Sequence, residues 1–172
     1  MDEIVVVDYD PEWPTRFAEI AGRVQTAFRD GPLITVEHIG STAVPGLAAK
    51  PIIDIDIVIL SSSDIPNSIA RLAVIGYVHE GNKGVEGREA FHWPPRTTRH
   101  HLYLCLSDNA EYHRHIAFRD YLRNHAITAG QYQALKRNLA LSFRDDRLAY
   151  NEGKTDFVEQ VLEKARSEDN DG

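Results

Sequence analysis

The run from Ile52 to Leu60 constrains the fold most, because it predicts a buried strand that carries two acids. Every residue in it is isoleucine, valine or leucine except Asp54 and Asp56. β-Branched residues favour extended backbone, and side chains along a strand alternate between its two faces. Asp54 and Asp56 are therefore expected to point to one face, and the isoleucines around them to the other.

Two carboxylates this close together repel each other. A cation, a raised pKa or solvent must relieve that repulsion. Mg²⁺ or Mn²⁺ would relieve it, since Mg²⁺ in proteins is commonly held by one or two carboxylates together with substrate phosphates. A strand whose polar face simply contacts water is the alternative, and the Asp-x-Asp spacing alone does not exclude it.

A loop rich in glycine and proline precedes this strand. A strand expected over residues 33–39 ends in Gly40-Ser41, and the loop continues to Pro51. Backbone N–H groups in such a turn can bind a phosphate, and glycine permits its close approach. The spacing is not that of a Walker A loop, and Gly-Ser after a strand is also common turn chemistry.

The other elements follow from hydrophobic spacing and from the positions of Gly and Pro. We expect further strands over residues 4–7, 77–79, 90–93 and 101–106. Helices are expected over residues 13–28, 63–75, 109–125, 129–147 and 154–166, with a break at 151–153. This order predicts an α+β protein in which helices pack on a short mixed β-sheet and the C-terminal part is helical.

Length and composition fit one domain, which we assign to residues 1–166, followed by a polar tail over 167–172 that we expect to be disordered. The chain lacks a signal-like start and a long apolar run, which predicts a cytoplasmic protein without a membrane partner. A net charge of -7 argues against a broad nucleic-acid surface. Cys105 lies in an apolar run and is expected to be a buried, unreactive thiol.

The combination of Gly-Ser and Asp-x-Asp resembles the signature of the nucleotidyltransferase superfamily. The longer run HIGSTAVPGLAAKPIIDI, from His38 to Ile55, resembles the GrpB-like family within it. Further matching segments are Arg99-His100-His101-Leu102, the run from Phe118 to Arg123, Tyr132, Leu135-Lys136, Tyr150 and Lys154. The resemblance extends from Tyr9 to about residue 165.

This resemblance implies a nucleotidyltransferase-like fold and a metal-dependent transfer of a nucleoside monophosphate from an NTP to an unknown acceptor. By the same resemblance, Gly40 and Ser41 bind the nucleotide phosphates, while Asp54 and Asp56 bind Mg²⁺ or Mn²⁺ and are catalytic. A third acid is expected on a neighbouring strand. The strand over 101–106 instead carries His101, Tyr103 and Cys105 on that face, although Glu89 is a remote substitute.

Cationic side chains supply the remaining candidates. His101 is the third catalytic candidate, as a metal ligand or a phosphate donor, and His100 is expected to face the core. The candidates for phosphate binding are Thr42, Lys50, Arg96, Arg99, Arg119 and Arg123. Each arginine has an ordinary alternative, a solvated loop for Arg96 and Arg99 and a solvated helix stripe with His115 for the other two. Tyr132, Lys136 and Lys154 are expected to close a basic cleft.

Three functions therefore remain in competition. The leading one is the nucleotidyltransferase, whose partners are an NTP and an acceptor. The second is a non-catalytic module that binds a nucleotide or another phosphorylated ligand, which the missing third acid favours. The third is an enzyme that modifies RNA ends or tRNA, which the acidic net charge does not support.

Overall fold

A five-stranded mixed sheet forms the centre of the computed structural model, which describes residues 3–171. Its strand order is β1-β2-β5-β4-β3. The strands are β1 (Ile34–Ile39), β2 (Ile53–Ile59), β3 (Val78–His79), β4 (Arg88–His92) and β5 (His100–Leu106). β2 pairs antiparallel with β1 and parallel with β5, whereas the other neighbours are antiparallel. The predicted α+β class with a mixed sheet is confirmed.

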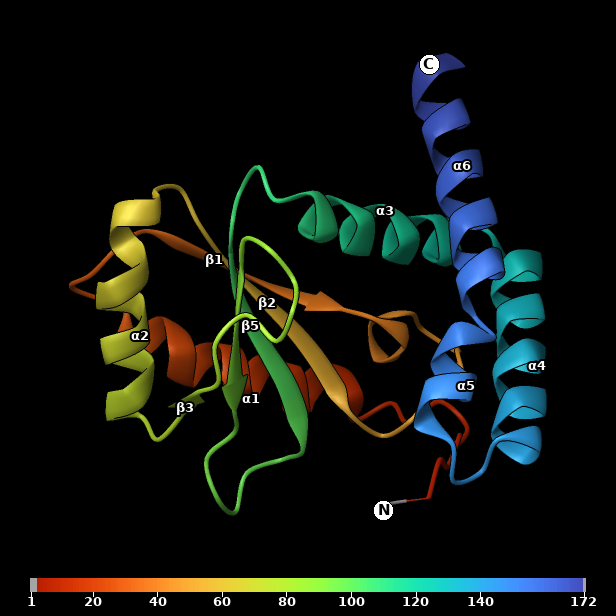
Figure 1. The fold of residues 1–172 in the computed structure, drawn as a ribbon, viewed down its shortest axis with the longest axis horizontal. Helices are drawn as coiled ribbons and strands as arrows, with labels where there is room; N and C mark the ends of the chain where they lie inside the picture. The colour runs from red at the N-terminus through yellow and green to blue at the C-terminus, as the bar shows by residue number, and fades with distance from the viewer. Residues whose placement is uncertain (1–2, 172) are drawn as a thin grey trace.

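Within residues 3–171 six helices accompany the sheet, and three of them gather at one side of the molecule (Figure 1). The helices are α1 (Trp13–Ala27), α2 (Ile65–Val74), α3 (Ala110–Asn124), α4 (Ala126–Ser142), α5 (Arg147–Glu152) and α6 (Thr155–Asp171). Two 3₁₀ turns, η1 (Ser41–Ala43) and η2 (Ser62–Asp64), follow β1 and β2. In Figure 1, α4, α5 and α6 lie together at the right, beyond the start of β2.

One face of the sheet packs into the main core. The odd-numbered isoleucines of β2, together with Leu102 and Leu104 of β5, are buried against α1 and α2. Trp13, Ile20 and Val24 recur at helical spacing along α1 and meet this face. The alternation of β2 therefore places its two aspartates on the opposite face, as predicted.

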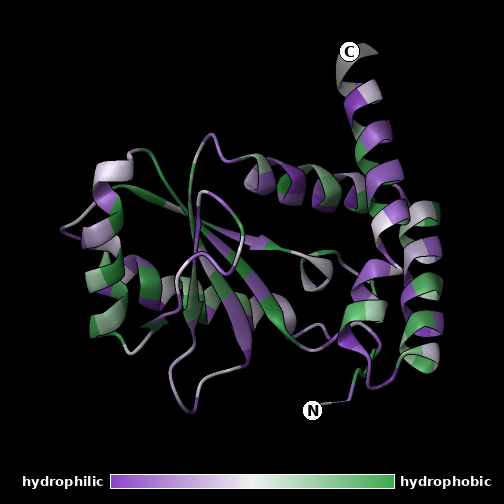
Figure 2. Cartoon of the chain, viewed as in Figure 1, coloured by the Kyte–Doolittle hydropathy of each residue, from purple (hydrophilic) through white to green (hydrophobic). Residues whose placement is uncertain are grey.

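The opposite face is polar and lies against α3. Hydrophilic residues dominate this helix, as Figure 2 shows. It contacts the sheet largely through polar pairs, among them His115 with Asp56 and Arg119 with Glu37. A second, smaller core joins α3, α4 and α6 beyond the sheet and includes Leu122 and Val161. α3 thus covers part of the polar face of the sheet.

Three local predictions differ from the structure. Residues 4–7 form no regular strand; their hydrogen bonds run to Ala49 and to the carbonyl of Arg144. The helix expected over 129–147 begins earlier, at Ala126, and ends at Ser142. A separate helix, α5, then spans residues 147–152 and includes part of the expected break; the Asp146 side chain accepts from Ala149 N–H and caps it. α6 continues to Asp171, so the backbone is helical in most of the tail expected to be disordered; Gly172 lies outside the described residues.

None of the helices within residues 3–171 combines the length and apolar character that crossing a membrane requires. Cys105 is buried among the strands, and burial raises the pKa of its thiol to about 12. It is therefore the unreactive thiol that its apolar neighbours predicted.

Candidate functional site

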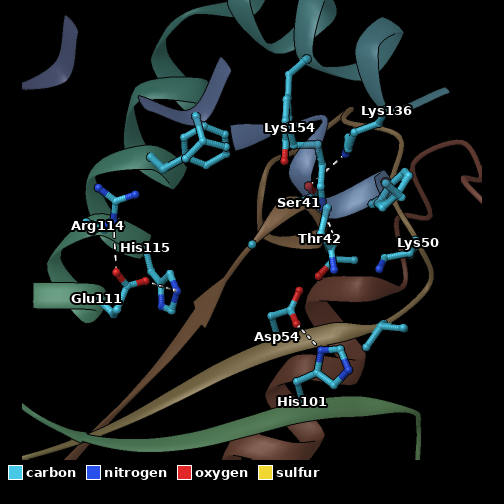
Figure 3. Close-up of a pocket in the computed structure, with 18 of the residues that line it drawn as sticks. Ser41, Thr42, Lys50, Asp54, His101, Glu111, Arg114, His115, Lys136 and Lys154 are labelled. Carbon is cyan, nitrogen blue, oxygen red and sulfur yellow. Dashed lines mark hydrogen bonds and ion pairs between the residues drawn. The ribbon is translucent and has the colours of Figure 1, made fainter. Parts of the chain in front are cut away.

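A cavity of about 390 Å³ lies between the start of β2, η1 and the helices α3 to α6. It brings together loop, strand and helix residues that are far apart in the sequence (Figure 3). Its polar lining consists of Gly40, Ser41, Thr42, Lys50, Asp54, His101, Glu111, Arg114, His115, Tyr132, Lys136, Arg147, Tyr150, Asn151 and Lys154. Phe118, Val158 and Leu162 are among its apolar residues.

The glycine turn and the first aspartate meet at this cavity. Ile39, the last residue of β1, pairs with Asp54 in the sheet register, so Gly40 follows beside that acid. Gly40 has a φ of +71°, a conformation that L side chains rarely adopt. A Cβ there would also lie 2.6 Å from Asp54 Oδ2. Both the backbone and the close approach therefore require glycine at this position.

Asp54 is paired with His101 across the parallel strands β2 and β5. The two residues are register partners, and His101 Nδ1–H donates to Asp54 Oδ1 over 2.7 Å (Figure 3). Both side chains are partly exposed, at 31% and 26%. His101 thus lies at the predicted position, and His100 on the other face is buried and hydrogen-bonded to Tyr77.

Asp56 is more deeply placed than Asp54. It is 1% exposed, and His115 of α3 donates from Nδ1–H to its Oδ2 over 2.7 Å. Burial lowers the pKa of His115, but the hydrogen bond and charge of Asp56, with Glu111 and Asp54, outweigh burial and raise it overall. The ring of His115, rather than Asp56 itself, contributes to the cavity wall.

Side chains of α4 hold the loop after Gly40 through hydrogen bonds. Lys136 Nζ donates to Ser41 Oγ over 2.9 Å and to the Ala48 carbonyl over 2.5 Å. Gln133 accepts from the N–H of the same Ala48. From the other side, His38 and Thr42 share a hydrogen bond of 2.9 Å, and burial lowers the pKa of His38 to about 4. The loop is therefore held at both ends.

Three lysines give the same cavity a cationic end. Burial, and then the charge of neighbouring lysines, lowers the pKa of Lys136 to about 7 and that of Lys154 to about 8. The pKa of Lys50 is lowered as well, first by burial and then by Arg147. Burial is the larger cause of these lowered pKa values, and the repulsion between neighbouring basic groups, which a bound anion would relieve, adds to it.

Two of the predicted phosphate-binding arginines lie elsewhere. The Arg119 guanidinium, 10% exposed, donates to Glu37, Asp120 and the His38 carbonyl and so ties α3 to β1. Arg123 donates to the Ala43 carbonyl behind the loop. Neither is among the residues that line the cavity. Arg119 is also no solvated surface residue, since it is buried.

The other two arginines precede β5 and also lie outside the cavity lining. Arg96 sits in a turn at a φ of +62°, and Arg99 stacks over Trp93 near a neighbouring groove. Glu89 does not replace the third acid either, because its carboxylate pairs with His79 at the sheet edge. The acid that reaches the cavity from α3 is Glu111.

Four lining residues had little or no signal in the sequence. Glu111, Arg114 and His115 come from α3, whose docking on the polar face of the sheet the helical pattern does not specify. Arg147 was expected to end the helix over 129–147 and instead begins α5. Lys136 and Lys154 were expected near the site through the resemblance alone.

The side chains at the cavity supply some of the oxygen ligands that a hard cation such as Mg²⁺ requires. Asp54 offers a carboxylate at the cavity, while one oxygen of Asp56 is engaged by His115 behind it. Within residues 3–171 no three His, Cys, Asp or Glu side chains are arranged as a metal site. Mg²⁺ or Mn²⁺ fits these residues if phosphate and water oxygens complete its coordination, which is the usual arrangement for Mg²⁺.

Comparison with known proteins relates this geometry to a family. The family model described as "GrpB protein" matches residues 3–164. "UPF0157 protein YqkA" of Bacillus subtilis is 33% identical over 165 residues, which cover 95% of this chain and 48% of that protein. The chain therefore spans about half the length of that relative.

Solved structures resemble this chain at two levels of similarity. The crystal structure of the conserved protein GrpB from Enterococcus faecalis matches with a TM-score of 0.84 and 34% identity, and covers 95% of this chain and 98% of that one. The Cid1 poly(U) polymerase with bound Mg 3'-dATP matches with a TM-score of 0.59 and 12% identity, over 86% of this chain and 49% of that one. At that identity the likeness concerns the fold alone, which is nucleotidyltransferase-like.

Proposed function

The chain belongs to the GrpB protein family, and from that premise we propose that it is a nucleotidyltransferase dependent on Mg²⁺ or Mn²⁺. It transfers a nucleoside monophosphate from an NTP to an acceptor and releases pyrophosphate. The observation that carries the proposal is the close approach of Asp54 to Gly40 at a cavity lined by five basic side chains, Lys50, Arg114, Lys136, Arg147 and Lys154. A carboxylate beside a glycine turn and several cations suits a metal-bound phosphate chain.

Each group then has a defined task. Gly40 allows the phosphate chain to approach the backbone, and Ser41 and Thr42 present hydroxyl groups beside it. Asp54 would hold the cation at the cavity, and Asp56, whose Oδ2 is engaged by His115 behind the cavity, would supply its other oxygen. The cation would neutralise charge on the phosphates. His101 holds Asp54 in place through its hydrogen bond. The lysines stabilise the negative charge that grows on the leaving pyrophosphate.

A non-catalytic binding module is the second candidate. Within the described residues, the β5 face beside the aspartates carries His101 and Tyr103 where the resemblance would place an acid. Each aspartate is engaged by a histidine. A protein of this kind would bind nucleotides through the same cavity and would leave them unchanged.

Labelled nucleotides separate the two candidates. Each of the four NTPs is labelled at the α-phosphate and incubated with Mg²⁺ or Mn²⁺, the wild-type protein and pools of RNA, protein or small-molecule acceptors. The enzyme is expected to move the label to an acceptor and to release pyrophosphate, and Asp54→Asn to abolish both. Nucleotide binding without transfer in every pool would favour the binding module. Asp108→Asn, an exposed acid after β5, is the matched control.

A further inference from the structure

A second groove, of about 340 Å³, adjoins the cavity of the candidate site. It lies between the N-terminal segment, the loop before β2 and the turn before α5. Lys50, Ile52 and Arg147 line both the groove and the cavity. The two spaces therefore share a wall, and two of its side chains are long and have many rotamers.

The groove begins where the parallel strands β2 and β5 begin. Ile52 lies two residues before Asp54, and Arg99 lies two residues before His101. The N–H of Ile53 donates to the Arg99 carbonyl, which continues the parallel pairing towards the groove. Side chains two residues apart on an extended chain share a face and are about 7 Å apart. A molecule in the groove therefore lies next to the pair of Asp54 and His101.

The lining of this groove combines an apolar surface with basic side chains. Its apolar residues are Ile4, Val5, Pro51 and Ile52. Its charged residues are the basic Lys50, Arg99 and Arg147 and the acidic Glu3 and Asp145. Glu3 forms an ion pair with Arg144, which lies outside the lining. The groove thus has an excess of positive charge beside an apolar surface, which suits an anionic group on an apolar body.

We propose that this groove binds the acceptor of the transfer, and that the acceptor is a small molecule with a carboxylate or phosphate group on an apolar body. The inference rests on the proposed function, which supplies the nucleotide that is transferred. The anionic group binds at the shared wall between Lys50 and Arg147, and Arg99 contacts it from the groove side. The apolar body packs on Val5 and Ile52.

An anionic acceptor also fits the residues beside Asp54. Within the described residues, the neighbouring face of β5 carries His101 and Tyr103 where the resemblance would place a third acid. A hydroxyl acceptor needs a base that removes its proton, whereas a carboxylate or phosphate oxygen at neutral pH needs none. This oxygen forms a bond to the α-phosphorus of the NTP, and the bond from that phosphorus to pyrophosphate breaks. The electron pair leaves with pyrophosphate, and no proton is transferred.

The probes are hexyl phosphate and hexanoate, each titrated into the full chain without nucleotide or metal. NMR follows the indole N–H signals of Trp13 and Trp93, the two tryptophans of the chain, and Trp93→Phe assigns them. The Arg99 guanidinium lies 5.9 Å from the centre of the Trp93 ring, whereas Trp13 is buried in the main core. We expect at least one probe to shift the Trp93 signal and leave the Trp13 signal in place.

Two further compounds test the class of ligand. Hexanol keeps the apolar body without the anion, and orthophosphate keeps the anion without the apolar body. Each is expected to bind at least about tenfold more weakly than the better of the two probes. The better probe also shows whether the groove prefers a phosphate or a carboxylate.

Variants test the assignment to the groove. Arg99→Met is expected to weaken binding of the better probe about tenfold. Arg96→Met is the matched control and should bind as the wild type does, because Arg96 is exposed, three residues earlier and outside both linings. Lys154 lines the cavity and not the groove. Circular dichroism checks that each variant is folded.

The inference is overturned if neither probe binds the folded wild type, if hexanol binds as tightly as the probes, or if Arg99→Met binds unchanged. A loss of probe binding in Lys154→Met with none in Arg99→Met would place the probe in the cavity and would also overturn it.

These outcomes are distinct from a failure of the proposed function. Probe binding that depends on Arg99, with no transfer of an α-labelled nucleotide to any acceptor, would leave the groove as a binding site for anions and remove the enzyme. Transfer of the label only to acceptors that lack an anionic group would keep the enzyme and overturn the inference.

Discussion

Gly40 and Asp54 lie so close together that a Cβ atom on Gly40 would be 2.6 Å from Oδ2 of the aspartate. The antiparallel register of β1 and β2 produces this contact, because Ile39 and Asp54 are paired and the turn begins at the next residue. The turn proposed to bind phosphate and the acid proposed to bind metal are thus positioned by the same strand pair.

Replacing Gly40 with alanine should therefore disturb the site more than strain alone would. Gly40→Ala adds the cost of a positive φ, about 1 kcal/mol, and forces Asp54 to move. Gly46→Ala is the matched control, since Gly46 has a φ of +79° but open space around its Cβ position. Urea denaturation and NTP titration measure the two effects. Equal losses of NTP affinity in both variants would contradict the role of the contact.

Acid should destabilise the protein through His38. The folded pKa of about 4 lies below the unfolded value of 6.5, so the unfolded chain binds more protons between these values. Stability is therefore lost as the pH falls from about 6.5 towards 4, by up to about 3 kcal/mol at the low end. In His38→Gln this part of the pH dependence should vanish. Urea denaturation from pH 7 to pH 4.5 measures it, and parallel curves for the two proteins would refute it.

Arg119 should matter for stability and not for ligand binding. Its buried guanidinium is shared by Glu37, Asp120 and the His38 carbonyl, so Arg119→Met is expected to lower the free energy of unfolding by about 2–3 kcal/mol. Arg123→Met, which removes a half-exposed side chain, should cost about 1 kcal/mol. The folded fraction of Arg119→Met should bind NTP within about twofold of the wild type. A much larger loss of NTP binding would contradict this and would indicate that Arg119 contributes to the binding site.

Sequence patterns predicted the sheet and the residues that β2, β5 and the glycine loop contribute to the site. The alternation of β2 placed Asp54 and Asp56 on one face, and the same reasoning separated His101 from His100. Periodicity of this kind depends on the chain itself and is visible in one sequence. Five predicted phosphate-binding or catalytic residues besides Asp54 line the cavity: Gly40, Ser41, Thr42, Lys50 and His101.

The residues that α3 contributes to the site were harder to predict from the sequence. α3 meets the sheet through ion pairs and hydrogen bonds, and its apolar residues, such as Leu122, pack on α4 and α6 instead. No hydrophobic pattern therefore indicates which of its residues face the sheet. His115, Arg119 and Arg123 looked like a solvated stripe for that reason, although His115 pairs with Asp56. Long-range polar partners are set by tertiary packing, which local spacing does not encode.

Isothermal titration of ATP, GTP, CTP and UTP, each with and without Mg²⁺, tests the central claim most directly. Wild type, Asp54→Asn and the exposed control Asp108→Asn are compared. The account predicts that Mg²⁺ strengthens the binding of at least one NTP to wild type and to Asp108→Asn, and that Asp54→Asn loses this gain, since Asp54 is the carboxylate at the cavity. NTP affinities that are unchanged by Mg²⁺, or an Asp54→Asn variant that keeps the full gain, would contradict a metal-dependent nucleotidyltransferase site at Asp54.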